Sequence, residues 1–182
     1  MNFIDKNNIL SKKNAFNREY MKKLILVRHA KSSWEFDVID HERPLKNRGI
    51  KDANLVANEL KSYNINPDKV LISDAARTKL TAQILLPALN IPDSKVSFEH
   101  KLYDFSGRDL VEVVRSCDDD IKTLMVFGHN HAITAFVNTY GDRFIDNVPT
   151  CGVVTVEFNE DKWSEINPGK TVFTIFPRDL KE

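Results

Sequence analysis

The stretch LILVRHA, residues 24–30, places four consecutive apolar residues directly before an arginine and a histidine. A short apolar run that stops at polar residues predicts a buried strand, here one that ends at Arg28 and His29. Two later apolar runs have the same form. Residues 70–72 are followed by Ser-Asp, and residues 124–127 are followed by Gly-His. The sequence therefore predicts three buried strands with polar side chains at their carboxyl ends.

Helical patterns separate these strands. Apolar residues recur at helical spacing, with charged residues between them, in the segments 47–63, 76–87, 109–116 and 133–140. Further strands are expected at 96–98, 154–158 and 171–176, the second of them half-exposed because Thr155 and Glu157 alternate with apolar residues. Strands that alternate with helices predict an α/β fold, a three-layer α/β/α domain with a mostly parallel central sheet.

The composition limits the classes of partner. The 182 residues include 26 basic and 26 acidic residues, so no net positive charge is available to bind nucleic acid along its length. No apolar run is long enough to cross a membrane, and residues 1–20 lack the apolar segment of a secretory signal. We expect a cytoplasmic protein with two reduced cysteines, a flexible extension at 1–20 and a single domain at 21–182.

The polar residues at the strand ends predict an anion site. If the three buried strands are parallel neighbours, their carboxyl ends meet, and Arg28, His29, Arg77 and His129 converge there. A phosphoryl group would satisfy such a cluster, since arginine binds phosphate oxygens with two parallel hydrogen bonds. Two local alternatives stay open: Arg77 could pair with Asp74 instead, and His129 could be an ordinary turn residue.

Four segments resemble the motifs of a known family in order. Residues 24–34 are similar to the opening signature of the histidine phosphatases, whose usual form is Arg-His-Gly. Here Ala30 replaces the glycine, as in the SixA-like phosphohistidine phosphatase branch. The other matching segments are a block at Arg43–Gly49, a Ser-x-x-x-Arg-x-x-x-Thr block from Ser73 to Thr81, and a late histidine block at Val126–Asn130. The resemblance implies a phosphoglycerate-mutase-like fold.

The resemblance also implies roles for individual residues. His29 would be the nucleophile that forms a phosphohistidine intermediate, and His129 would donate to the phosphoryl group. Arg28 and Arg77 would bind its oxygens, with Ser32 as a minor contact. No metal or other cofactor is expected, because the arginines supply the positive charge. A backbone carbonyl is expected to hold His29 in one tautomer.

The general acid is the open question for the substrate. Asp104 follows Leu102-Tyr103, where many relatives carry a glutamate, and is a candidate. If no acid is present, phosphohistidine in a phosphorylated protein is favoured, because imidazole can leave as a neutral molecule. The short segment between Arg77 and His129 agrees with this, since it predicts a shallow, open groove. The alternatives are a small-molecule phosphomonoesterase or mutase-like enzyme, and a phosphate-binding module without catalysis.

Overall fold

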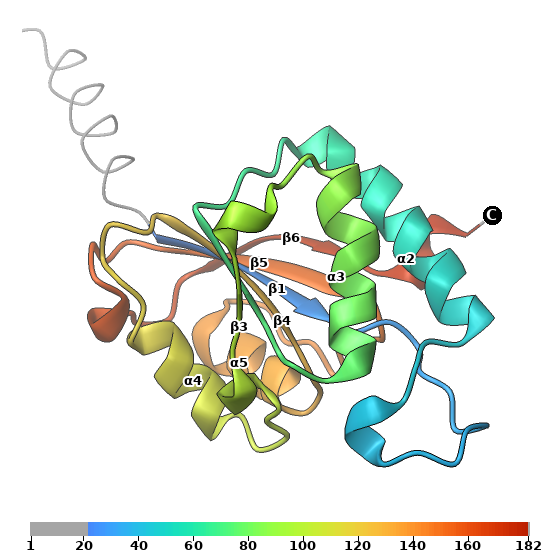
Figure 1. The fold of residues 1–182 in the computed structure, drawn as a ribbon. Helices are drawn as coiled ribbons and strands as arrows, with labels where there is room; N and C mark the ends of the chain where they lie inside the picture. Colours follow the sequence, from blue (N-terminus) through green and yellow to red (C-terminus); the bar gives the residue numbers. More distant parts are fainter. Residues whose placement is uncertain (1–21, 182) are drawn as a thin grey trace, which may run out of the picture.

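Six strands form the central sheet of this computed structural model, which describes residues 22–181 (Figure 1). The strands are β1 Lys22–Arg28, β2 Lys69–Ile72, β3 Val96–Phe98, β4 Thr123–Gly128, β5 Val153–Phe158 and β6 Lys170–Ile175, in the spatial order β3-β2-β4-β1-β5-β6. The strands β3, β2, β4 and β1 run parallel, and β5 and β6 complete the sheet as an antiparallel pair. The extension expected at residues 1–20 lies outside the described residues.

Helices cover both faces of the sheet (Figure 1). Ile25 and Val27 of β1 pack in one apolar cluster with α2 (Asn47–Leu60) and α3 (Ala76–Ala88). Leu24 and Leu26 point to the opposite face, where α4 (Arg108–Arg115) and α5 (Ala132–Tyr140) close a second cluster. Both faces of a central parallel strand are therefore buried, which explains why its sequence is continuously apolar. The three-layer α/β/α prediction is confirmed. Among the described residues, no helix is long and apolar enough to span a membrane.

The predicted elements lie close to the observed ones, with one error in burial. We expected β5 to be half-exposed, but Thr155 is completely buried. β5 lies between β1 and β6, and Thr155 shares a face with Val153, whose partner across the strand pair is Ile175. Both apolar neighbours belong to the cluster beneath α2 and α3, so the helical layer covers this polar position. The prediction from the alternating pattern was wrong because a polar residue in a strand does not indicate whether helices pack over it.

The three buried strands end level with one another. Val27 of β1 and Ile72 of β2 both pair with Phe127 of β4, which lies between these two strands. The amide of His29 donates to the carbonyl of Gly128, so the chain stays tied to β4 beyond the strand. The residues that follow all three strands are therefore held at one edge of the sheet, as the sequence predicted.

A loop between β1 and α2 forms one wall of this edge. Its two ends are joined by a bridge between Ser32 and Leu45 and by a hydrogen bond from the amide of Lys46 to the carbonyl of Lys31, 2.8 Å long. Gly49, in the first turn of α2, lies directly against Lys31: an added Cβ would stand 2.3 Å from its carbonyl oxygen. A glycine is therefore required for the loop to lie against the helix.

We predict that Gly49→Ala lowers the free energy of unfolding by about 1–3 kcal/mol, the range of an overpacked site. Gly128→Ala is the matched control, because its Cβ would meet no atom closer than 3.7 Å. Urea denaturation of the three proteins measures the difference. Equal stability of the two variants would contradict the close contact between α2 and Lys31.

Candidate active site

The two ring nitrogens of His29 have different partners, a backbone carbonyl and an arginine. Its Nδ1 lies 2.8 Å from the carbonyl oxygen of Ala30, a geometry in which Nδ1–H donates. Nε2 then carries the lone pair, and it accepts a 3.3 Å hydrogen bond from Nε of Arg77. The expectation that a backbone carbonyl sets the tautomer is confirmed. A neutral imidazole with an accessible Nε2 lone pair is the form that can act as a nucleophile.

His129 lies beside His29 but deeper. The two ring centroids are 5.1 Å apart, and Nε2 of His129 is 2.8 Å from Oγ of Ser73. The rings of Tyr103 and Phe105 pack against His129, with centroids 5.3 Å away in each case. Its Nδ1 is buried without a hydrogen-bond partner among residues 22–181. Its hydrogen bond to Ser73 is therefore the contact that orients the ring of His129.

Burial keeps both imidazoles neutral. Desolvation and the nearby Arg77 and Arg28 guanidinium groups together lower the pKa of His29 to about 3, although its hydrogen bond to Ala30 acts in the opposite direction. The pKa of His129 falls to about 2 because of burial and the neighbouring His29. Proton uptake by either ring would place another positive charge beside the arginines.

The Ser-x-x-x-Arg-x-x-x-Thr block holds the two histidines together. Ser73 contacts His129, and Arg77, in the first turn of α3, contacts His29. One turn later, Oγ1 of Thr81 accepts a 2.9 Å hydrogen bond from the amide of Ala30 and donates to the carbonyl of Arg77. Each polar position of the block thus fixes one part of the site.

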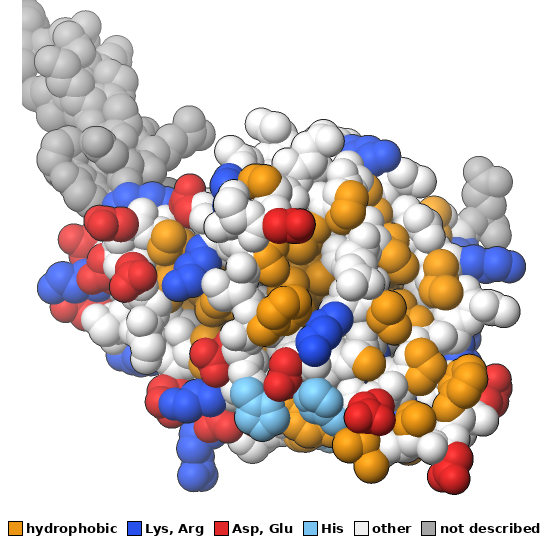
Figure 2. Space-filling view, viewed as in Figure 1, with side chains coloured by type: hydrophobic (Ala, Val, Ile, Leu, Met, Phe, Trp, Pro, Cys, Tyr) orange, Lys and Arg blue, Asp and Glu red, His pale blue; other side chains and the backbone are white. Residues whose placement is uncertain are grey.

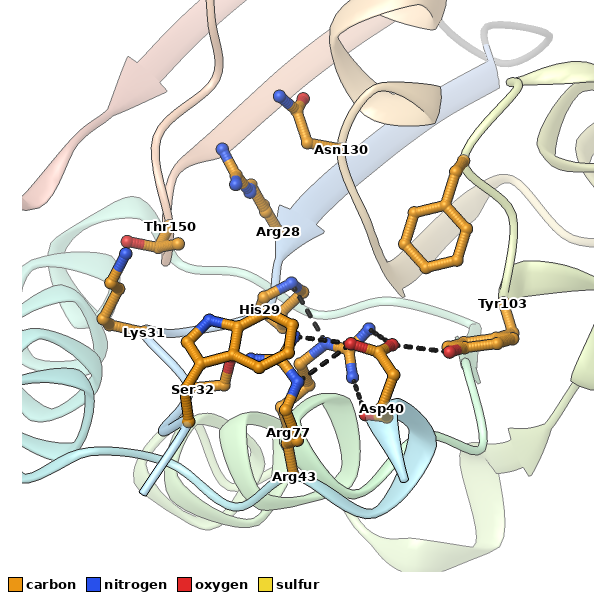
Figure 3. Close-up of a pocket in the computed structure, with 12 residues that line it drawn as sticks. Arg28, His29, Lys31, Ser32, Asp40, Arg43, Arg77, Tyr103, Asn130 and Thr150 are labelled. Carbon is orange, nitrogen blue, oxygen red and sulfur yellow. Dashed lines mark hydrogen bonds and ion pairs between the residues drawn. The ribbon is translucent and has the colours of Figure 1, made fainter. Parts of the chain in front are cut away.

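The two arginines and two histidines predicted from the strand ends lie in one region of the structure, but only three of them line its cavity. A cavity of about 460 Å³ is lined by Arg28, His29, Arg77 and Ser32, whereas the more deeply placed His129 is not among its lining residues. Figure 3 shows Arg28 on the Asn130 side of the pocket, away from Asp40. Its guanidinium donates to the carbonyl of Val148 at 2.6 Å, and its Nε is buried without a partner in the described part of the chain.

Asp40 occupies the mouth of this cavity and was not predicted. Its Oδ2 is 3.0 Å from the guanidinium of Arg77, and its Oδ1 is 2.8 Å from that of Arg43 (Figure 3). The hydroxyl of Tyr103 donates to Oδ2 at 2.5 Å. Although partial burial would raise the pKa of Asp40, the hydrogen bond from Tyr103 and the two arginines lower it to about 2. A carboxylate therefore fills the position where these arginines would hold an oxyanion.

Arg43 and Tyr103 were also missed as site residues. Arg43 belongs to a recognised motif, but no role was predicted for it. In the structure its guanidinium contacts Oγ of Ser32 at 2.8 Å and lies 3.5 Å from the ring of Trp34. The only available signal for Arg43 was its place in that motif. Asp40 and Tyr103 carried none, since the contacts of Asp40 with Arg77 and Tyr103 join residues that are distant in sequence.

The structure places Asp104, the candidate general acid, outside the residues that line the cavity. Its carboxylate accepts hydrogen bonds from the amides of Ser106, Gly107 and Leu110, and so satisfies donors at the start of α4. Burial would raise its pKa, but these hydrogen bonds hold it below the usual range. The structure makes Asp104 an ionised capping group rather than a proton donor.

Comparison with known proteins agrees with this geometry. The sequence profile of the histidine phosphatase superfamily (branch 1) matches residues 24–109. An uncharacterized chloroplastic protein of Arabidopsis thaliana is 30% identical over 153 residues, which span 79% of this chain and 70% of that protein. The chain belongs to the histidine phosphatase superfamily.

Solved structures place the fold of this histidine phosphatase among known ones. A protein assigned as the phosphohistidine phosphatase SixA of Agrobacterium tumefaciens superposes with a TM-score of 0.73 at 21% identity, covering 86% of this chain and 98% of that one. A phosphoglycerate mutase from Bacillus anthracis gives a TM-score of 0.59 at 17% identity, covering 84% and 92% of the two chains. The predicted phosphoglycerate-mutase-like fold is confirmed. The profile match ends before His129, so it is the structure that places His129 beside His29.

We predict that the two buried imidazoles make stability fall as the pH falls. In the unfolded chain they titrate near pH 6.5, whereas in the folded protein they stay neutral, so the unfolded state binds more protons below that pH. Between about pH 6.5 and 4, each imidazole should reduce the free energy of unfolding by about 1.4 kcal/mol per pH unit. Denaturant unfolding at several pH values measures this slope.

The double variant His29→Gln/His129→Gln should show a shallower slope than the parent protein. His131→Gln is the control, because it removes an exposed histidine that is not one of the two buried imidazoles. A double variant with the parent slope would show that other groups cause the pH dependence.

A second prediction concerns Asp40. An incoming oxyanion has to displace the Asp40 carboxylate from Arg77 and Arg43. Asp40→Asn should therefore tighten phosphate binding by about 3- to 10-fold, which corresponds to the free energy of a partly exposed ion pair. Isothermal titration calorimetry with inorganic phosphate measures the change. Glu42→Gln, at an exposed position of the same turn, is the control. Weaker binding by Asp40→Asn would instead mean that the carboxylate holds the arginines in place for the ligand.

Proposed function

We propose that this protein is a phosphatase that accepts a phosphoryl group on Nε2 of His29 and then releases it to water. One observation carries the proposal: His29 lines the cavity in which Arg77 and Arg43 hold an anionic group, and its Nε2 lies 3.3 Å from Nε of Arg77. A phosphoryl group in place of the Asp40 carboxylate would bring its phosphorus next to the nucleophile. The superfamily membership supports the same chemistry.

The proposed reaction has two steps. In the first, the Nε2 lone pair attacks phosphorus while the bond to the leaving group breaks, and the leaving group keeps that electron pair. In the second, water attacks the phosphohistidine, one proton passes to the released phosphate, and Nε2 regains its lone pair. Throughout, Nδ1–H stays bonded to Ala30, which prevents the ring from turning. Guanidinium groups would stabilise the charge on the equatorial oxygens, so these steps need no metal.

The ionisation of nearby carboxylates supports phosphohistidine as the substrate. A phosphate ester requires a proton for its departing alkoxide. Asp104 is tied to the start of α4, and Asp40, with a pKa of about 2, has no proton to give near neutral pH. A phosphorylated imidazole that carries a proton on its other nitrogen leaves as a neutral molecule. It therefore needs no carboxylic acid in the pocket.

The rim of the cavity supports a protein as the bearer of that group. Trp34 is 73% exposed and Phe105 is 46% exposed, and both line the cavity. Phe36 and Ile39 of the β1–α2 loop add further exposed apolar side chains, at 57% and 67%. Exposed apolar surface beside the cavity suits contact with another protein. One solved structure of similar fold is described as the protein histidine phosphatase SixA complexed with tungstate. The cytoplasmic location stays a prediction.

The test compares substrates in one assay. We expect a histidine-phosphorylated protein to be hydrolysed at least about 100-fold faster than sugar phosphates or a nucleotide, because general-acid assistance to an ester is worth about that much. Rapid acid-free quench with labelled substrate should trap phosphate on His29. A preference for a sugar phosphate would favour a small-molecule phosphomonoesterase or mutase-like enzyme.

Variants separate catalysis from binding in this assay. His29→Ala should abolish turnover and phosphoenzyme formation, whereas His131→Ala, at an exposed site beyond β4, should retain both. Circular dichroism checks that each variant is folded. Turnover by folded His29→Ala would place the nucleophile elsewhere, and phosphate binding without turnover by the parent protein would support a module that only binds phosphate.

A further inference from the structure

A second cluster of ligand-type side chains lies outside the catalytic pocket. Asp74 stands between two histidines: its Oδ1 is 2.9 Å from Nε2 of His41, and its Oδ2 is 2.8 Å from Nδ1 of His100. Figure 2 shows histidine side chains together with acidic groups on the surface of this face. None of the three residues lines the cavity around His29, and neither the proposed reaction nor the family motifs use the two histidines.

The three residues come from separate segments of the chain. His41 is in the short helix η1 (Asp40–Glu42), Asp74 follows β2, and His100 begins the short helix η4 (His100–Leu102). Tyr103 anchors both imidazoles, with its ring centroid 5.0 Å from that of His41 and 6.3 Å from that of His100. The convergence is therefore a product of the fold, with Tyr103 as a neighbour that both rings share.

The donor set matches a borderline divalent transition metal. Two imidazole nitrogens and one carboxylate oxygen are common ligands of Zn²⁺, and the three ligand atoms lie within 4.8 Å of one another. Tetrahedral zinc with bonds of about 2.0 Å separates its ligand atoms by about 3.3 Å, so small rotations of the side chains would suffice. Asp74 is ionised: burial raises its pKa, but hydrogen bonds from His41 and His100 hold it below the usual range.

The exposure of the cluster indicates an open coordination sphere. The side chains of His41 and Asp74 are 30% and 29% exposed, and that of His100 is 75% exposed. Water can therefore reach the remaining coordination position, and His100 is free to turn toward a cation. A site of this kind can take up metal after folding.

We propose that His41, Asp74 and His100 form a binding site for a divalent transition metal such as Zn²⁺, on the outer rim of the catalytic pocket. Such a cation would tie the turn that carries Asp40 to the ends of β2 and η4. The proposal concerns binding alone and does not depend on the phosphatase reaction.

The test uses the full, untagged chain and two metals. Titration with Co²⁺ should give the visible d–d absorption of a low-symmetry site. Zn²⁺ should then displace the bound Co²⁺, with one Zn²⁺ bound per chain. His100→Gln and His41→Gln should each weaken Zn²⁺ binding more than about tenfold, since even an outer-shell partner of a ligand is worth that much. Zn²⁺ should also raise the melting temperature of the parent protein but not of these variants.

Two controls locate the metal. His131→Gln removes an exposed histidine elsewhere and should bind Zn²⁺ as the parent does. His29→Gln should also retain the site, which separates it from the catalytic histidine pair. Unchanged binding by His41→Gln and His100→Gln, loss of binding only in His29→Gln, or no binding by the folded parent would each overturn the proposal.

Discussion

The level ends of three parallel strands are the constraint on which this site depends. β4 lies between β1 and β2, and Val27 and Ile72 pair with the same residue, Phe127. A shift of β1 by one residue would turn its side chains to the opposite face and carry His29 away from His129. The apolar clusters on both faces of the sheet oppose that shift. The same packing that stabilises the fold therefore sets the 5.1 Å separation of the two imidazoles.

The site joins buried cations to buried neutral rings, and the loop before α2 supplies the missing negative charge. Arg77 is almost fully buried, and a buried charge is unfavourable unless it is paired. Asp40 provides that pair in the ligand-free protein. Because Asp40 belongs to the β1–α2 loop, release of its carboxylate by an incoming oxyanion would remove one contact of this loop, while Arg77 also binds the carbonyl of Asp40 at 2.6 Å. Ligand binding and loop position are therefore expected to be linked through the same two arginines.

Residues that depend on local pattern were predictable, and residues that depend on distant partners were not. The strand ends at His29 and His129 followed from apolar runs of four residues, a length typical of a buried strand and too short for a helix. Asp40 could not be predicted as the partner of Arg77, since the choice between Asp40 and Asp74 is made by the path of the β1–α2 loop. The role of Asp104 stayed open for a related reason: its sequence context is the same whether its carboxylate faces the pocket or, as found, the amides at the start of α4.

The pairing of Asp40 also bears on which leaving groups the site can assist. As long as Arg77, Arg43 and Tyr103 surround it, its carboxylate is ionised and cannot donate a proton. A phosphoryl group that takes over both arginines would displace the Asp40 carboxylate from its cationic partners, and the pKa of Asp40 would rise only if it remained close to the dianion. Proton donation by Asp40 would thus require the carboxylate to stay near a site from which it has just been displaced. A neutral imidazole as leaving group avoids this conflict, which is the physical reason to favour phosphohistidine over an ester.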